Sequence, residues 1–342
     1  MKGSSIHFDQ VMGREAAARV VDGRLDDLLI DPPENRIRPG AIYRAKAGRP
    51  MKGQGGMILD TPDGPLFLRQ SKGIAQGETV FAQASTYAET GKATPAALKL
   101  LFKSRFCLLT PGATGRNLSK AIRDEERRVE LQEIVHGLDL PEDIGLVVRT
   151  AAEAADDGEV AEDLMALTDV ARQILDEPRS GPVEKLLEGP SASELALRDW
   201  PPPDVFDQEN GAFARAGVDE MIEALASPEE RFSEGSIVVE ATRALVAVDV
   251  NSGGNTSMAA GLSANVAALR VLPRALRLRG LGGQIVVDPA PLPKRDRKRL
   301  EDTAKSAFRR DGIETTFVGW TPLGHMEFLR KRERLPLSEA LL

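Results

Sequence analysis

Two short apolar runs that each end near an aspartate constrain the fold of this chain most strongly. The first run, ALVAVDVNSG, covers residues 244–253, and the second, GGQIVVDP, covers residues 282–289. Each holds four or five β-branched or aliphatic residues bounded by glycine or asparagine, which predicts a fully buried strand. A carboxylate at the end of a buried strand is costly to desolvate unless a cation or hydrogen-bond donors meet it.

Asp249 and Asp288 therefore form a candidate site for a hard divalent ion. If the two strands are neighbours, both carboxylates lie at the same end of the sheet. Mg²⁺ prefers oxygen ligands of this kind and keeps some of its waters. An alternative is purely structural, with Asp249 starting an Asx-type turn and Asp288 preceding a proline turn.

The charge of the chain is strongly segregated. The net charge is −7. Residues 151–230 contain 21 acidic and five basic side chains, a local charge of −16, so the rest of the chain carries about +9. Residues 270–299 contain nine Lys or Arg against two Asp. Because binding depends on the local field, this basic segment is compatible with a phosphodiester ligand such as RNA. The alternative is that these charged residues form an ordinary solvent-exposed surface that binds no ligand.

Composition excludes several other classes. With a single cysteine, Cys107, the chain cannot form an internal disulfide or a thiolate zinc site. The three histidines show no metal-ligand spacing, so we expect no zinc. No run of 18 apolar residues indicates a membrane helix. The start, MKGSSIHFDQ, lacks the apolar region of a signal peptide, so a cytoplasmic location is expected.

The hydrophobic pattern predicts several domains. AARVVDGRLDDLLID predicts a hairpin turning at Asp22-Gly23. Short strands with glycine turns from about residue 40 to 94 predict a small OB-type barrel, with Phe67 as a candidate for stacking on RNA bases. Residues 116–136 predict a charged helix capped by Asn117 or Ser119. The region after residue 233 predicts an α/β domain with this order: strand 236–240, strand 244–250, helix 257–279, strand 284–288, helix 294–310, strand 313–318 and helix 322–332.

The C-terminal region resembles the catalytic core of the ribonuclease E/G family of endoribonucleases. The matching segments are GSIVVEATRALVAVDVNSG, NVAALRVLPRALRLRGLGGQIVVD and GHMEFLRKR, in the family's order and spacing. The N-terminal segments VVDGRLDDLLID and AIYRAKA, and GLVVRTA at residues 145–151, are more weakly similar.

The resemblance implies a multidomain α+β and α/β protein. It implies an RNase H-like part (residues 1–38 and about 180–232), a degenerate OB-like RNA-binding barrel (39–96) inserted into that part, a region similar to a 5′-monophosphate sensor (97–179), and a DNase I-like catalytic domain (233–342). It also implies Mg²⁺-dependent cleavage of single-stranded RNA in RNA processing or decay, leaving 5′-phosphate and 3′-hydroxyl ends. Homo-oligomer assembly stays open.

The resemblance also assigns roles to individual residues. Asp249 and Asp288 would hold one Mg²⁺, and Asn251 would orient the first carboxylate or the scissile phosphate. Arg149 and Thr150 match the pair that grips a terminal monophosphate. The spacing of the arginines, rather than the resemblance, indicates a further site. Arg270, Arg274, Arg277 and Arg279 are spaced by 4, 3 and 2 residues, so the first three share a helix face and form a candidate phosphate track with Arg279, the alternative being a solvated face.

The chain also departs from the family pattern. Pro289-Ala290-Pro291 replaces the aromatic and acidic residues usual after the second metal aspartate. The loop at residues 253–256 lacks a basic residue, Ile58 stands where the barrel would have an aromatic residue, and the zinc-binding cysteines that join subunits are absent. The proline segment supports one alternative, a catalytically weak or inactive RNA-binding relative. A separate alternative is a metal-dependent phosphohydrolase acting on a small phosphate ester, which would need neither the arginine helix nor the barrel.

Overall fold

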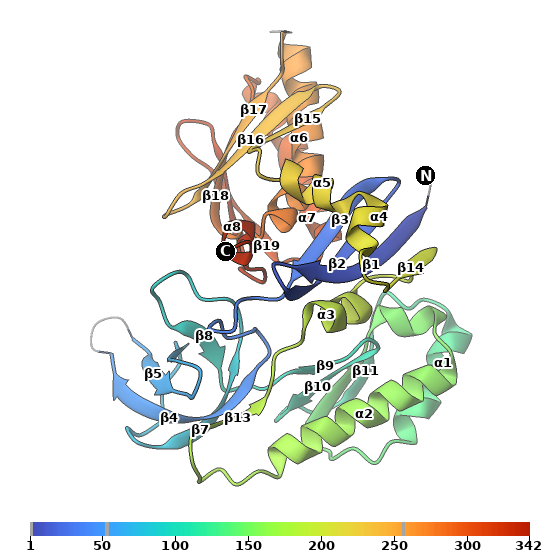
Figure 1. The fold of residues 1–342 in the computed structure, drawn as a ribbon, viewed down its shortest axis with the longest axis vertical. Coiled ribbons are helices and arrows are strands. Elements are labelled where there is room, and N and C mark those ends of the chain that lie inside the picture. Colours follow the sequence, from blue (N-terminus) through green and yellow to red (C-terminus); the bar gives the residue numbers. More distant parts are fainter. Residues whose placement is uncertain (1–2, 52–54, 255–256) are drawn as a thin grey trace. The chain divides into compact units, whose positions relative to one another are not determined.

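The computed structural model describes residues 3–51, 55–254 and 257–342 as a mixed α and β protein (Figure 1). The chain divides into two compact units, one formed by residues 1–32 and 203–342 and the other by residues 33–202. Each unit contains β-sheets and buried apolar clusters of its own. The predicted α+β character is confirmed.

The first unit begins with an N-terminal sheet in the strand order β14-β1-β2-β3. The strands are β1 (Ser4–Val11), β2 (Arg14–Val21), β3 (Arg24–Ile30) and β14 (Val205–Asp207). Asp22 and Gly23 both have positive φ angles, which a tight hairpin turn requires, so the predicted hairpin is confirmed. The short helices α4 (Ala212–Ala216) and α5 (Val218–Ala224) pack against the apolar side chains of this sheet.

The larger sheet of the first unit has the strand order β15-β16-β17-β18-β20-β19. Its strands are β15 (Glu229–Phe232), β16 (Gly235–Ala241), β17 (Val246–Asn251), β18 (Gly283–Asp288), β19 (Thr315–Trp320) and β20 (Met326–Arg330). The strands β17 and β18 are parallel, because helix α6 (Met258–Leu278) provides the crossover between them. Helix η2 (Lys294–Asp296) precedes α7 (Arg297–Asp311), and α8 (Leu337–Ala340) follows the sheet.

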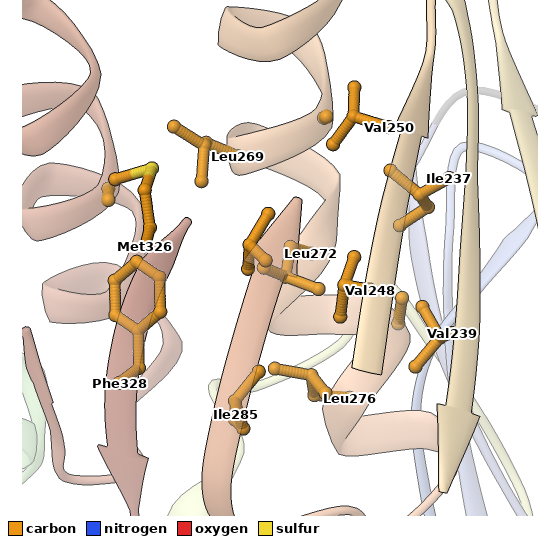
Figure 2. Packing of buried hydrophobic residues seen from close by; sticks show 14 of the residues in the cluster. Ile237, Val239, Val248, Val250, Leu269, Leu272, Leu276, Ile285, Met326 and Phe328 are labelled. Atoms are coloured by element: carbon orange, nitrogen blue, oxygen red, sulfur yellow. The ribbon is translucent and has the colours of Figure 1, made fainter. Parts of the chain in front are cut away.

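Helices α6 and α7 cover one face of this sheet. Figure 2 shows Leu269, Leu272 and Leu276 of α6 among the inward side chains of the strands, such as Val248 and Ile285. The buried cluster also includes residues of α7, among them Leu300, Ala304 and Phe308. The strands were predicted to be buried on both faces, and this is wrong: burial alternates along β17 and β18, so one face packs and the other is open.

The predicted helix at residues 322–332 is also wrong, because β20 occupies this segment. Met326, Phe328 and Arg330 face inward, whereas Glu327 and Leu329 face outward, which is the two-residue period of a strand. β20 pairs with both β18 and β19, so two ladders of hydrogen bonds outweigh the helix propensity of Met, Glu and Leu.

The second unit contains a closed barrel. Its strands follow the order β4-β5-β6-β8-β7, and β7 pairs back to β4 to close the ring. These strands are β4 (Ile42–Pro50), β5 (Met57–Asp60), β6 (Leu66–Leu68), β7 (Thr79–Ala84) and β8 (Thr94–Ala97), with β13 (Glu184–Leu187) added beside β4. Tyr43, Met57 and Leu59 are fully buried inside the barrel. The predicted OB-like barrel is confirmed.

The other layer of the second unit is a sheet in the order β11-β12-β10-β9, packed against helices. Its elements are β9 (Phe102–Lys103), β10 (Cys107–Pro111), β11 (Arg116–Leu118), β12 (Ile144–Val148), α1 (Glu125–His136), η1 (Thr150–Ala154), α2 (Asp157–Leu175) and α3 (Ala192–Asp199). The helix expected from residue 116 begins only at Glu125, because residues 116–118 pair with β12. Asp124 caps it by accepting from Arg127 N, so the predicted cap at Asn117 or Ser119 is wrong.

Among the helices that the structure describes, none combines the length and the apolar composition needed to cross a bilayer.

Candidate active site

The site is built around Asp249 and Asp288, which face each other across neighbouring strands. They form a register pair between the parallel strands β17 and β18, and neighbouring strands lie about 4.8 Å apart. Val248, Val250 and Val287, the sequence neighbours of the two aspartates, are buried against the helices, so both aspartates project from the open face. The fold therefore brings the two predicted metal ligands together.

Both carboxylates are accessible to solvent. Asp249 is exposed, and 63% of the Asp288 side chain is exposed. The desolvation penalty expected for a buried strand end does not apply, because only the helix-facing side of the sheet is buried. A cation at this pair would keep water ligands on its free side, as Mg²⁺ does when one or two carboxylates bind it.

Asn251 shares the open face with Asp249, two residues further along β17. Its Nδ2 donates a hydrogen bond to Asp249 Oδ2 at 2.8 Å. This bond fixes one carboxylate oxygen and leaves the other oxygen available, which is the arrangement expected of a residue that orients a metal ligand. Asn255 and Thr256 of the following loop lie outside the described residues.

His325 is a neighbour of the site that sequence reasoning missed. Its Nε2 lies 3.6 Å from Asp288 Oδ1. The turn between β19 and β20 positions it, where His325 N donates to Thr321 Oγ1 and Thr321 N donates to the His325 carbonyl. The one available signal was that His325 lies in GHMEFLRKR, a segment that resembles the family.

The donor set fits a hydrated magnesium ion better than a metal held only by protein. In the described part of the chain, no group of three or more His, Cys, Asp or Glu side chains is placed to hold a metal ion. Two adjacent, solvent-accessible carboxylates are nevertheless what Mg²⁺ uses when water and substrate phosphate complete its octahedron. The residues that would hold it are Asp249 and Asp288.

The loop after Asp288 is fixed to helix α6. Asn265, which is 1% exposed, donates from Nδ2 to the carbonyl of Ala290 and accepts from Ala290 N through Oδ1, both at 2.8 Å. A Cβ on Gly261 would lie only 2.7 Å from the carbonyl oxygen of Pro291, so this loop packs closely on the helix. The Pro-Ala-Pro segment is therefore an anchored loop, and Asn265 is a second positioning residue that sequence reasoning missed.

The predicted arginine track on α6 is largely engaged in contacts within the first unit. Arg270 remains exposed, whereas Arg279 is 8% exposed and burial lowers its pKa. The partners of the others are Glu230 and the Leu25 carbonyl for Arg274, Asp27 and Asp311 for Arg277, and the Ser227 carbonyl for Arg279. The RNA-binding role of these arginines stays a prediction.

The two predicted sensor residues adjoin each other but have different partners. Arg149 directly follows β12. Its Nη2 donates to Asp199 Oδ1 at 2.8 Å, and its Nη1 donates to backbone carbonyls that include that of Arg105. Thr150 Oγ1 lies 2.9 Å from Ser119 Oγ. The guanidinium is thus engaged by an internal carboxylate.

Phe67 lies on β6 of the barrel and is half-buried. Its ring closes over Gly56, where a Cβ would lie 2.9 Å from the ring atoms. The predicted stacking role therefore applies, at most, to the part of the ring that remains exposed.

Comparison with known proteins identifies the family. The model of the ribonuclease E/G family matches residues 102–207 and 204–333. Ribonuclease G of Escherichia coli K12 is 24% identical over 95% of this chain and 79% of the relative. Ribonuclease E of Haemophilus influenzae is 26% identical over 95% of this chain and 41% of the relative. Since the family model covers more than half of the sequence, this chain belongs to the ribonuclease E/G family.

Proposed function

We propose that this protein is a Mg²⁺-dependent endoribonuclease that cleaves single-stranded RNA, leaving 5′-phosphate and 3′-hydroxyl ends, in RNA processing or decay. The observation that carries the proposal is the register pair of Asp249 and Asp288 on the open face of the sheet. Membership of the ribonuclease E/G family, with relatives named ribonuclease G and ribonuclease E, supports RNA as the substrate.

In this proposal Asp249 and Asp288 hold the metal ion, and the hydrogen bond from Asn251 keeps Asp249 in the orientation that binding needs. When bound, Mg²⁺ polarises a phosphoryl oxygen and lowers the pKa of an attacking water. The anchored loop at residues 289–291 keeps Asp288 beside Asp249. His325, at 3.6 Å from Asp288, is placed to donate to a carboxylate oxygen or to a phosphate nearby.

We further propose domain roles along the chain. The barrel at residues 39–96 would bind RNA, because a closed barrel of this kind offers a groove for single strands. Residues 233–342 would form the DNase I-like catalytic domain, residues 1–38 and about 180–232 the RNase H-like part, and residues 97–179 the 5′-end sensor region.

The test is cleavage of a 5′-monophosphorylated, AU-rich single-stranded RNA oligomer with Mg²⁺ or with EDTA. We expect internal cuts that disappear in EDTA and in the Asp249→Asn and Asp288→Asn variants, because an amide is a poor ligand for Mg²⁺ compared with a carboxylate. Glu240→Gln is the matched control: it removes an exposed carboxylate from the same face of the sheet, on β16 opposite Ala247, and should leave cleavage unchanged.

The same assay separates the alternatives. Tight retention of RNA without any Mg²⁺-dependent cut would contradict the enzyme proposal and support a non-catalytic RNA-binding relative. Hydrolysis of a small phosphate ester without cuts in the RNA oligomer would instead support a phosphohydrolase.

A further inference from the structure

A groove of about 870 Å³ lies between α6 and α7, within the first unit and apart from the residues of the proposed cleavage site. We call it the α6–α7 groove. Basic residues dominate its charged lining, with six Lys or Arg against three Asp. The charged residues are Arg270, Arg274, Arg277, Lys298, Arg299 and Arg310, with Asp26, Asp302 and Asp311.

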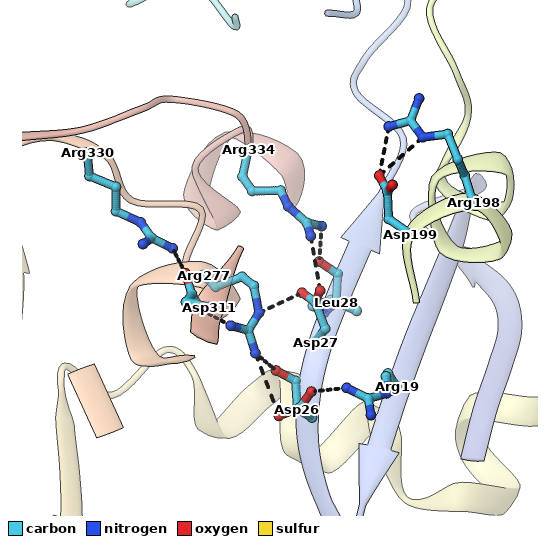
Figure 3. Close-up of polar contacts among 10 residues, drawn as sticks. All are labelled: Arg19, Asp26, Asp27, Leu28, Arg198, Asp199, Arg277, Asp311, Arg330 and Arg334. Atoms are coloured by element: carbon cyan, nitrogen blue, oxygen red, sulfur yellow. Dashed lines mark hydrogen bonds and ion pairs between the residues drawn. The ribbon is translucent and has the colours of Figure 1, made fainter. Parts of the chain in front are cut away.

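The base of this groove is neutralised by ion pairs inside the protein. Asp311, whose side chain is 1% exposed, bridges Arg277 and Arg330, as Figure 3 shows. Asp26 in turn lies 2.7 Å from Arg19 and 3.6 Å from Arg277. These charges satisfy one another, so they hold α6, α7 and β3 in place rather than attract a ligand.

The rim of the groove is different. Arg274 pairs with Glu230 and Lys298 pairs with Asp302, but the exposed Arg270, Arg299 and Arg310 have no carboxylate within ion-pair distance among the described residues. Unpaired guanidinium groups on opposite walls of a groove produce a local positive field. Such a field favours a ligand that carries phosphates.

The wall formed by α7 is a regular stripe. Arg299, Thr303, Ser306 and Arg310 are spaced by 4, 3 and 4 residues, which places them on one helix face. From Arg299 to Arg310 the stripe is about 16 Å long, because eleven residue steps each rise by about 1.5 Å along the helix. A single phosphate ion cannot span that length, whereas a strand with a phosphate at every nucleotide can.

The groove also faces away from the candidate cleavage site. Its walls are the helices that cover the packed face of the larger sheet, while Asp249 and Asp288 project from the opposite, open face. A ligand in the groove therefore cannot be the phosphate held at the two aspartates.

We propose that the α6–α7 groove is a second RNA-binding site, in which Arg270, Arg299 and Arg310 bind the phosphodiester backbone of a segment distant from the cut. The inference takes from the proposed function only that the ligand is RNA. The groove would hold long substrates by backbone contacts that carry no sequence information.

The test measures RNA binding without cleavage. Fluorescence anisotropy of a labelled single-stranded RNA oligomer is recorded in EDTA at several salt concentrations, for the wild type and for the triple variant R270Q/R299Q/R310Q. We expect weaker binding, and a slope of log affinity against log salt that is shallower by about 2, since each contact with a single strand contributes about 0.7.

Arg309→Gln is the matched control, because Arg309 is an exposed arginine of the same helix that does not line the groove. It should leave the salt slope unchanged. Thermal unfolding of each variant checks that it is folded, and we expect it to match the wild type because the substituted side chains are exposed. An unchanged slope in the folded triple variant would overturn the proposal, and so would an equal loss in Arg309→Gln.

A second arm distinguishes the source of the phosphates. Calorimetry with inorganic tripolyphosphate is run on the wild type and the triple variant. Tight tripolyphosphate binding that the triple variant loses, with RNA binding unaffected, would overturn RNA as the ligand. Because neither arm requires cleavage, failure here is distinguishable from failure of the Asp249 and Asp288 test.

Discussion

Among single residues, Asp199 controls what the guanidinium of Arg149 can bind. Asp199 Oδ1 lies 2.8 Å from Arg149 Nη2 and 2.9 Å from Lys103 Nζ. Burial alone would raise the pKa of Asp199, but its hydrogen bond and ion pair with Arg198, together with Lys103, outweigh this and hold the pKa well below its usual range. The carboxylate therefore stays charged and competes with any terminal phosphate for Arg149.

If Arg149 binds a terminal phosphate as proposed, this competition predicts how the preference for a 5′ end responds to substitution. Asp199→Asn should increase the ratio of cleavage rates for monophosphorylated over hydroxyl 5′ ends, because it removes the competing charge from Arg149. Arg149→Ala should lower that ratio. The ratio is measured with two oligomers that differ only at the 5′ end.

Arg172→Ala provides the control for this experiment, since Arg172 is paired with Asp139 elsewhere in the same unit. It should leave the ratio at its wild-type value. If the wild type and both test variants show no preference for either 5′ end, Arg149 is not a sensor residue.

The sequence was sufficient to propose some residues of the candidate site and insufficient for others. Asp249 and Asp288 could be proposed because each lies at or near the end of a recognisable strand within a family-like segment. Asn265 and His325 could not, since their roles depend on Ala290 and Asp288, which lie 25 and 37 positions away along the chain. A buried amide that bonds a loop backbone leaves no periodic signal in a sequence.

At the scale of elements, the strands of the larger sheet were predictable because β-branched runs are distinctive. The predicted helix start at residue 116 and the predicted helix at residues 322–332 were wrong for the same reason. Residues 116–118 and β20 form strands only because of their pairing partners, β12 for the first and β18 and β19 for the second. The prediction that Arg270, Arg274 and Arg277 share one face of a helix was correct, since all three line the same groove. Their partners could not be predicted, because Asp26 and Asp27, which pair with Arg277, lie about 250 positions away along the chain.

The contact between α6 and the loop after β18 gives a prediction at this scale. Asn265→Ala should lower the free energy of unfolding by roughly 2–6 kcal/mol, because it leaves the buried N–H and C=O of Ala290 unpaired, at about 1–3 kcal/mol each. Denaturant unfolding measures this loss. The Mg²⁺ concentration for half-maximal cleavage should also rise, since the loop that follows Asp288 is no longer anchored.

Asn117→Ala is the control for this substitution, because Asn117 is exposed on β11. It should change the unfolding free energy by no more than about 0.5 kcal/mol. If Asn265→Ala unfolds at the same denaturant concentration as the wild type, the anchoring role is excluded.

At the scale of the whole molecule, the chain leaves the first unit after Pro32 and returns to it at Pro203. The returning segment joins the N-terminal sheet directly, since β14 pairs with β1. The first unit has its own buried clusters, one under the N-terminal sheet and one under the larger sheet. It therefore has the features of a unit that folds without the inserted residues.

Removing residues 33–202 tests this independence. The strand ends next to the removed segment are Ile30 of β3 and Val205 of β14. They lie in one sheet, roughly 20 Å apart from the strand spacing and register. A Gly/Ser linker of about ten residues, with an end-to-end distance of roughly 18 Å, can join them. We expect the shortened chain to unfold cooperatively in thermal circular dichroism. A non-cooperative transition would show that the first unit requires the second.

The pairing register of β17 and β18 also limits which insertions and deletions this protein can accept during evolution. Inserting or deleting one residue in either strand, ahead of its aspartate, would turn that aspartate toward the packed face, because side chains alternate with a period of two. The barrel loops and the linkers between units can lengthen freely by comparison. An insertion or deletion ahead of Asp249 or Asp288 within these strands must therefore be of an even number of residues if both aspartates are to stay on the open face.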